Sequence, residues 1–370
     1  MRVLTHQAFS IHAIGGGARI LRRLFEGCEK DVVSLCLKCS SHASPSGPFV
    51  EREVSAFPLR RRWHRGLPGK IFDLARTRIF REANLAKVRR VASAMDFDVL
   101  HVVAHGRFNS TFCNPASRGG KPLWVSFHDH WITGADNPAD IKSLWRAADR
   151  RFVISSELGQ KYSNDFGSAD WRILSDGVAD SEFQNPRSHH GKALNLYFGG
   201  MLHVDYYPLF EAMADALDRL ADQGWQPVMH LRGTQRLPFM QGRRFETRQL
   251  PATLSDDELR TDHQLADILY LPIGFSMPHF YLHSLSTKMV GYLAAPGAIL
   301  FHGPLDSAAA RLLRGAEAAA FTDSLKPQPL VNAILQAASQ SLHFSSHAKS
   351  LAKERFNLAE MRARFWNLNA

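Results

Sequence analysis

The chain has 370 residues, a formal net charge of +10 at neutral pH and 45% hydrophobic residues. This length exceeds what one hydrophobic core usually fills, so we expect two domains. The composition is that of a folded globular protein, and it excludes wholesale disorder. No apolar run approaches the roughly 20 residues that cross a bilayer, and the first residues lack the apolar core of a signal peptide. We therefore expect a cytoplasmic protein.

Short apolar strands alternate with helices through the first half of the chain. Strands are predicted within residues 1–6, 31–38, 96–105, 122–131, 148–155 and 171–178. A glycine-rich turn enters an amphipathic helix at 14–27, a Ser/Pro/Gly loop occupies 40–49, and a basic helical region follows that loop. A later helix at 155–167 has Ser155 or Ser156 as its N-cap. This alternation predicts a parallel, doubly wound sheet.

The same pattern restarts after a polar linker at 187–193. Strands are predicted within 194–202, 226–233, 245–252, 267–274, 298–301 and 318–323, and the clearest helices are 206–224 and 255–266. We divide the chain into an N-terminal domain at 1–185, a C-terminal domain at 186–350 and a last helix within 351–370. That helix either returns to the first domain or docks on its own. Ligands of doubly wound sheets bind beyond the carboxyl ends of the strands.

Two glycine-rich turns and one helix start are candidate anion sites. They are Gly15, Gly16 and Gly17 after the first strand, Gly199 and Gly200 after the strand that opens the second half, and Ser286, Thr287 and Lys288 at a helix start. Glycines let the backbone approach a phosphate closely, and a helix start offers free N–H groups and partial positive charge. Simple turns and ordinary helix capping are the alternatives that need no ligand.

Polar side chains follow the buried strand at 122–127. His128 and Asp129 stand there, where an imidazole can hydrogen-bond a sugar hydroxyl or stabilise an oxyanion. A satisfied structural histidine is the plain alternative. His128 and His130 have no third metal ligand in view, and Cys36 and Cys39 have no second cysteine pair, so we predict no metal site.

The order of these motifs resembles the GT-B glycosyltransferases, and among them the retaining, sugar-nucleotide-dependent family 4. Five stretches carry the resemblance: the glycines at 15–17, "SFHDHW" at 126–131, "RRFVISSELGQKY" with "ILSDGV" at 150–178, "LYFGGML" at 196–202 and "LSTKMVGYLAAPGAILFHGP" at 285–304. The resemblance covers most of the chain. It implies an α/β fold with two Rossmann-like doubly wound domains facing an interdomain cleft, with the acceptor on the first domain and the nucleotide sugar on the second.

The resemblance also implies roles for particular residues. The donor is a UDP- or GDP-linked sugar, and no cofactor is required. His128 contacts the donor sugar near the reacting centre, and Asp129 and His283 are further sugar-contact candidates. The glycine turns, with Ser286 and Thr287, bind the diphosphate. Lys288 stabilises the charge that builds on the departing phosphate.

Three residues depart from the family pattern. Met201 stands where an arginine is usual after the glycine pair, and Arg232 is a substitute cation or a plain surface residue. The family's paired glutamates fall on His283 and Gly291. Gly291 stands where a glutamate typically binds the nucleotide ribose, so the donor is bound differently there or transfer is lost.

The segment at 59–90 mixes arginines with large apolar residues. Such a surface suits anionic lipid, as expected for a polysaccharide or lipid-linked acceptor at the inner face of the membrane. A solvated helix face is an equal alternative. Nucleic acid is the third, but no recognised nucleic-acid module accompanies the segment, so we expect no nucleic-acid partner.

We therefore expect a glycosyltransferase that moves a sugar from a nucleotide donor to a polysaccharide or lipid-linked acceptor, with retention. A catalytically silent GT-B-like scaffold protein in glycan assembly is the alternative that Gly291, His283 and Met201 suggest. A sugar-nucleotide epimerase fits less well, because no set of acid/base carboxylates is recognisable in the second half. Binding of nucleotide sugars separates the first two hypotheses.

Overall fold

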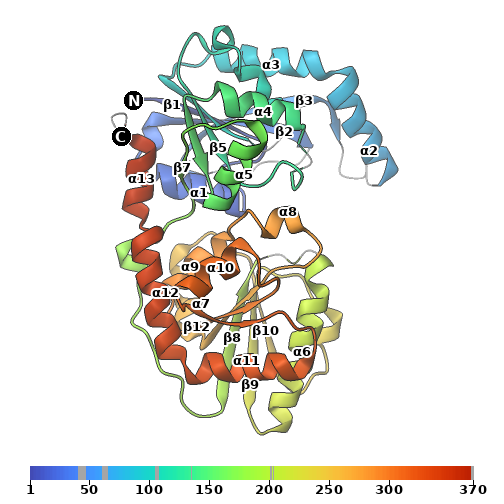
Figure 1. The fold of residues 1–370 in the computed structure, drawn as a ribbon. Coiled ribbons are helices and arrows are strands. Elements are labelled where there is room, and N and C mark those ends of the chain that lie inside the picture. The colour runs from blue at the N-terminus through green and yellow to red at the C-terminus, as the bar shows by residue number, and fades with distance from the viewer. Residues whose placement is uncertain are drawn as a thin grey trace. The chain divides into compact units, whose positions relative to one another are not determined.

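The computed structural model describes residues 1–40, 47–60, 66–104, 108–134, 136–200, 202 and 204–367. Met201, Trp63 in the basic segment, part of the predicted loop at 40–49 and the side chain of Cys39 lie outside this description. The chain forms two compact units, one of residues 1–175 with 362–370 and one of residues 176–361 (Figure 1).

The first unit is built on a seven-stranded parallel sheet with the strand order β3-β2-β1-β4-β5-β6-β7. Its strands are β1 Val3–Gln7, β2 Val32–Ser40, β3 Val50–Arg60, β4 Val99–Val103, β5 Leu123–Phe127, β6 Arg150–Val153 and β7 Arg172–Ile173. Its helices are α1 Gly16–Phe25, α2 Leu67–Leu74, α3 Arg81–Ser93, α4 Pro138–Ala147 and α5 Ser156–Phe166, with a π-helical turn at Ala75–Ile79. The predicted cap of α5 is confirmed for Ser155, whose side chain accepts a hydrogen bond from the Leu158 N–H.

The second unit repeats this design with six parallel strands in the order β10-β9-β8-β11-β12-β13. The strands are β8 Ala193–Gly199, β9 Gln226–Arg232, β10 Glu246–Leu250, β11 Ile268–Pro272, β12 Ala298–His302 and β13 Ala319–Thr322. The helices are α6 Tyr207–Asp222, α7 Asp256–Leu265, α8 Pro278–Tyr281, α9 Thr287–Leu293, α10 Ala308–Gly315, α11 Pro327–Ser339 and α12 Ser341–Arg355. Both sheets have the 3-2-1-4-5 order of a doubly wound Rossmann fold.

The last helix, α13 Leu358–Trp366, contains the point at which the chain passes from the second unit to the first. Its final residues pack on α1. The Arg362 Nε donates to the Arg23 carbonyl at 2.8 Å, the Trp366 Nε1 donates to the Leu24 carbonyl at 3.1 Å, and Phe365 lies edge-on to Phe25. These contacts give the end of the chain a fixed place on the first unit.

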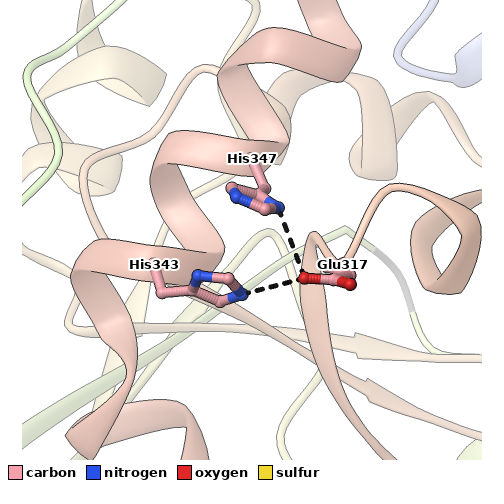
Figure 2. A group of neighbouring side chains, drawn as sticks. All are labelled: Glu317, His343 and His347. Carbon is pink, nitrogen blue, oxygen red and sulfur yellow. Dashed lines mark ion pairs between the residues drawn. The ribbon is translucent and has the colours of Figure 1, made fainter.

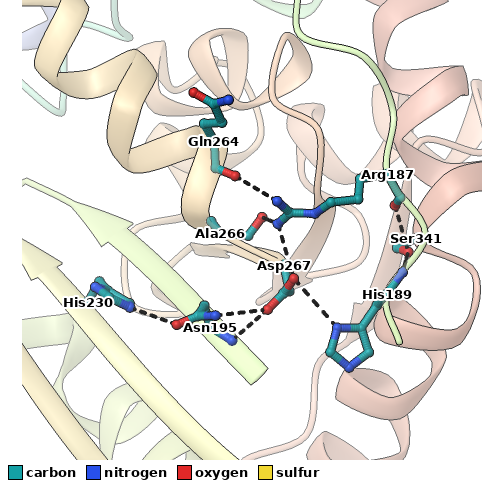
Figure 3. A network of polar contacts seen from close by, with 8 residues as sticks. All are labelled: Arg187, His189, Asn195, His230, Gln264, Ala266, Asp267 and Ser341. Atoms are coloured by element: carbon teal, nitrogen blue, oxygen red, sulfur yellow. Dashed lines mark hydrogen bonds and ion pairs between the residues drawn. The ribbon is translucent and has the colours of Figure 1, made fainter. Parts of the chain in front are cut away.

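The polar linker before β8 is anchored to the second sheet by Asp267, which directly precedes β11 (Figure 3). Its carboxylate accepts the Asn195 N–H at 2.9 Å and pairs with Arg187 at 3.1 Å and with His189 at 3.5 Å. Ser341 at the start of α12 holds the linker from the other side, since its hydroxyl donates to the Arg187 carbonyl and accepts the His189 N–H. Residues 187–189 are therefore held in place on the second unit by these contacts.

Buried histidines mark the interior of the first sheet. The His101 ring lies between the hydroxyls of Thr5 and Ser126, at 3.0 and 2.8 Å. Burial lowers the pKa of His101 to about 3 and the pKa of His6 to about 4. Both imidazoles are therefore neutral in the folded protein at neutral pH, and each gains a proton more readily in the unfolded chain.

We expect the free energy of unfolding to fall by about 1 kcal/mol for each of these two histidines between pH 7.5 and pH 5.5. The unfolded imidazoles titrate near their ordinary pKa of about 6.5. Their contribution is therefore complete above that pH and is lost as the pH falls toward the folded values. Urea unfolding at the two pH values measures the change, and a His101→Gln variant should show a smaller pH dependence. An identical pH dependence in this variant would contradict the assignment.

Candidate functional site

A glycine turn at the carboxyl end of β8 is the first part of the site in the second unit. Gly200 has φ of +121°, a conformation that residues with a side chain rarely adopt. Its N–H donates to the Arg232 carbonyl at 2.7 Å, and its carbonyl accepts the Thr234 hydroxyl at 2.8 Å. The turn is thus held on both sides by the end of β9.

Lys288 packs directly against this turn. A Cβ built on Gly200 would lie 2.7 Å from the Lys288 Cε and 3.3 Å from its Nζ, so a side chain at this position would force the end of the lysine side chain to move. The Nζ lies 5.0 Å from the centre of the Phe198 ring. Burial lowers the pKa of Lys288 to about 8. The contact joins Gly200 and Lys288, which lie 88 residues apart in the sequence.

Within the described part of the chain, no carboxylate or carbonyl is paired with the Lys288 ammonium, whose charge is therefore uncompensated. A half-buried cation without a counter-charge favours a bound anion. Ser286 occupies the N-cap position of α9, but its side chain makes no capping hydrogen bond, so ordinary capping does not explain this residue. Because α9 has only seven residues, we assign the attraction for an anion to the lysine and not to the helix dipole.

Arg232 is neither a surface residue nor a second free cation. Its side chain is only 10% exposed. Its guanidinium pairs with both oxygens of Asp262, at 2.6 and 2.8 Å, and lies 3.2 Å from Glu258. This bidentate ion pair with Asp262 on α7 compensates the charge of the Arg232 guanidinium. The prediction that Arg232 is a surface residue is therefore wrong, and its predicted role as a phosphate-binding cation lacks a free guanidinium.

Tyr292 and His263, which the sequence did not identify as site residues, lie at the glycine turn and α9. The Tyr292 hydroxyl accepts the Gly199 N–H at 3.1 Å, which ties α9 to the glycine turn. Among the described residues outside its own helix, a Cβ on Gly291 would meet only His263, whose Cε1 lies 3.7 Å away. His263 also lies edge-on to the Tyr292 ring. His283 contacts the carbonyl of His279, one turn earlier in its own segment, at 3.2 Å.

The first unit brings its own predicted residues together at the carboxyl ends of β1 and β5. Gly15 precedes α1, which begins at Gly16. A Cβ on Gly17 would lie 2.9 Å from the Phe9 Cζ and 3.5 Å from the His128 Nδ1. His128 is buried. The carbonyl of Asp129 accepts the Tyr162 hydroxyl at 3.2 Å, which fixes the backbone after β5.

Replacing Gly200 by alanine is expected to weaken binding of a nucleoside diphosphate by about tenfold or more, because the new methyl group displaces the Lys288 side chain. Gly242→Ala is the matched control. Gly242 also has a positive φ of +67°, but a Cβ there meets nothing within 4 Å. Isothermal calorimetry with UDP and GDP measures the effect. Equal losses of affinity in the two variants would show that backbone strain alone is responsible.

The fold of this chain is the GT-B fold, because its two parallel-sheet Rossmann-like units match solved structures over almost their whole length. One is HepE from Anabaena in complex with UDP and glucose, with 12% identity, 98% of both chains covered and a TM-score of 0.66. A second is sucrose-phosphate synthase from Thermosynechococcus elongatus, with 12% identity, 98% of this chain and 97% of that chain covered, and a TM-score of 0.65.

A third structure is the UDP-forming α,α-trehalose-phosphate synthase from Burkholderia vietnamiensis. It shares 9% identity, covers 99% of this chain and 98% of its own, and has a TM-score of 0.61. At the sequence level, residues 15–174 match the family model of a glycosyl transferase 4-like domain. No curated protein matches the chain. No helix among the described residues combines the length and the apolar character that crossing a membrane requires.

Proposed function

We propose that the protein is a glycosyltransferase that moves a sugar from a nucleotide-sugar donor to a saccharide acceptor. The observation that carries the proposal is the uncompensated Lys288 ammonium against the Gly200 turn, at the edge of the sheet where doubly wound domains bind ligands. The match to a glycosyl transferase 4-like domain and the likeness to structures solved with UDP support it.

The proposed chemistry needs positive charge at the departing diphosphate. Transfer breaks the bond between the anomeric carbon and a phosphate oxygen, and negative charge grows on that oxygen as the bond lengthens. The Lys288 ammonium stabilises this charge more strongly in the transition state than in the ground state, which is the condition for catalysis. The contact of His128 with the donor sugar stays a prediction, and retention follows from the resemblance to family 4 alone.

The proposed acceptor is a polysaccharide or a lipid-linked saccharide at an anionic membrane surface. Its support is an unusual group of exposed apolar side chains on α2 and the π-helical turn after it. These are Leu67, Ile71, Leu74 and Ile79. Leu67 and Ile79 are 71% and 74% exposed, and the neighbouring Lys70 is also exposed. Arg76 is not part of that surface, because it is buried and donates to the Pro58 carbonyl at 2.8 Å.

A thermal-shift screen with UDP-, GDP- and other nucleotide sugars tests the proposal. A ligand that binds only the folded state raises the apparent stability, so one nucleotide class should raise Tm selectively. Release of nucleoside diphosphate in the presence of an acceptor glycan then shows transfer. No shift with any nucleotide sugar would overturn the proposed donor site.

Gly291 supports the second candidate, a catalytically silent glycan-assembly protein with a GT-B fold. The position offers no carboxylate for a ribose, and the described side chain that lies beside it is the ring of His263. The same screen separates the two. Selective binding followed by turnover identifies the enzyme, whereas binding without turnover or donor hydrolysis identifies the silent protein.

A further inference from the structure

Three metal-ligating side chains converge on the second unit at a place that the proposed donor site does not use (Figure 2). They are Glu317, in the turn between α10 and β13, and His343 and His347 on α12. One ligand atom from each of the three lies within 4.8 Å of the other two. His343 and His347 are four residues apart and therefore project from the same face of the helix, with ring centres 4.2 Å apart.

The distances suit one shared cation. The Glu317 Oε2 lies 3.5 Å from the His343 Nε2 and 3.9 Å from the His347 Nδ1. Ligand atoms bound to one tetrahedral Zn²⁺ at about 2.0–2.1 Å lie about 3.3 Å apart, so small side-chain rotations close the site. Two imidazoles and one carboxylate are a donor set for Zn²⁺ or a similar transition metal, whereas Ca²⁺ and Mg²⁺ prefer oxygen alone.

The backbone also presents Glu317 toward the helix. Glu317 has φ of +51°, the left-handed conformation that ends many helices and that glycine usually adopts. Its N–H donates to the Arg314 carbonyl, and the Ala318 N–H donates to the Leu313 carbonyl, so the turn is fixed independently of the carboxylate. A carboxylate therefore stands where glycine is the ordinary choice, and its side chain reaches the two imidazoles.

The site lies far along the chain and the sheet from the Gly200 turn. Glu317 precedes β13 and thus stands at the amino ends of the parallel strands, whereas Gly200 follows β8 at their carboxyl ends. An open surface pocket of about 330 Å³ is lined by Glu317 and His343, together with Arg314, Gln336 and Gln340. This space leaves the remaining coordination positions open to water.

We propose that Glu317, His343 and His347 form a binding site for one Zn²⁺ or similar divalent transition-metal ion that ties α12 to the turn before β13. One hydrogen bond competes with the ion. The His347 Nδ1 lies 3.1 Å from the Ala316 carbonyl. A metal ion on this nitrogen replaces that contact, and the imidazole then carries its proton on Nε2. The exposed position and this competition give a site of moderate affinity, which we place in the micromolar range.

Equilibrium dialysis of Zn²⁺ against the full chain, without a polyhistidine tag, tests the proposal. We expect about one Zn²⁺ per chain, and at least about tenfold weaker binding in His343→Ala and in His347→Ala. His343 is exposed and His347 is half-buried, and alanine is the residue that an α-helix tolerates best. His190→Ala, at another exposed histidine, is the matched control and should bind Zn²⁺ as the unchanged chain does.

Glu317→Gly separates loss of the ligand from loss of the fold. Glycine relieves the left-handed conformation, so this variant should be at least as stable as the unchanged chain while it loses Zn²⁺ affinity. A Zn²⁺-dependent rise in Tm should accompany binding in the unchanged chain and in His190→Ala only. Unchanged Zn²⁺ affinity in His343→Ala and His347→Ala, or an absence of micromolar binding by the unchanged chain, would overturn the site. UDP binding in these variants is expected to be unaffected.

Discussion

Lys288→Met is expected to lower kcat/KM for sugar transfer by about 100-fold, which corresponds to about 2.7 kcal/mol of lost transition-state stabilisation. Methionine keeps an unbranched apolar stem against Gly200 and Phe198 but removes the ammonium group. Because the charge on the diphosphate grows during bond breaking, kcat should fall together with the affinity for the donor. Steady-state kinetics with the donor identified by the screen measure both quantities.

Lys353→Met provides a matched control for this experiment. Lys353 also has its ammonium over an aromatic ring, 5.4 Å from the centre of Phe183, but it lies exposed on α12. Its variant should retain the activity of the unchanged chain. If Lys288→Met retained full turnover as well, the assignment of the diphosphate to Lys288 would be wrong.

Asp267→Ala is expected to lower the free energy of unfolding of the second unit by about 1–3 kcal/mol. The Asp267 side chain is only 12% exposed, and it satisfies an arginine, a histidine and an asparagine at once. Alanine leaves the backbone N–H and the side-chain amide of Asn195 without this acceptor, and it removes the ion pair with Arg187, whose side chain is 41% exposed and keeps the Gln264 and Ala266 carbonyls as acceptors (Figure 3). Urea unfolding gives the change in stability.

Asp257→Ala is the control for that measurement. Asp257 also pairs with an arginine, Arg260, at 2.8 Å, but its side chain is 84% exposed. Exposed pairs of this kind contribute about 0–1 kcal/mol. A loss at Asp267 no larger than the loss at Asp257 would contradict the view that residues 187–189 are locked to the sheet.

Local chemistry made much of the fold predictable. Apolar strands followed by capped amphipathic helices identified both parallel sheets, and Ser155 was recognisable as an N-cap. The edge strand β3 was missed because its charged residues and its proline interrupt the apolar pattern of a buried strand. Helix α4 was missed too, although Asn137 caps it and Pro138 begins it.

The site was predictable only where residues adjacent in the sequence form a recognisable motif. Gly200 and Lys288 were each predicted at an anion site, but their direct contact depends on how β8 and α9 pack. The bidentate partner of Arg232 lies 30 residues away, on a helix that sequence patterns do not orient. Glu317 and the two imidazoles on α12 likewise meet only because β13 and α12 are neighbours in the folded unit.

Calorimetric titration of UDP at pH 7.5 and pH 9 tests the central claim most directly, with Lys288→Met beside the unchanged chain. A group with a pKa of about 8 is about three-quarters protonated at the lower pH and about one-tenth protonated at the higher pH. UDP binding should weaken by roughly eightfold between these pH values in the unchanged chain only. The absence of UDP binding at both pH values, or an equal pH dependence in Lys288→Met, would contradict this claim.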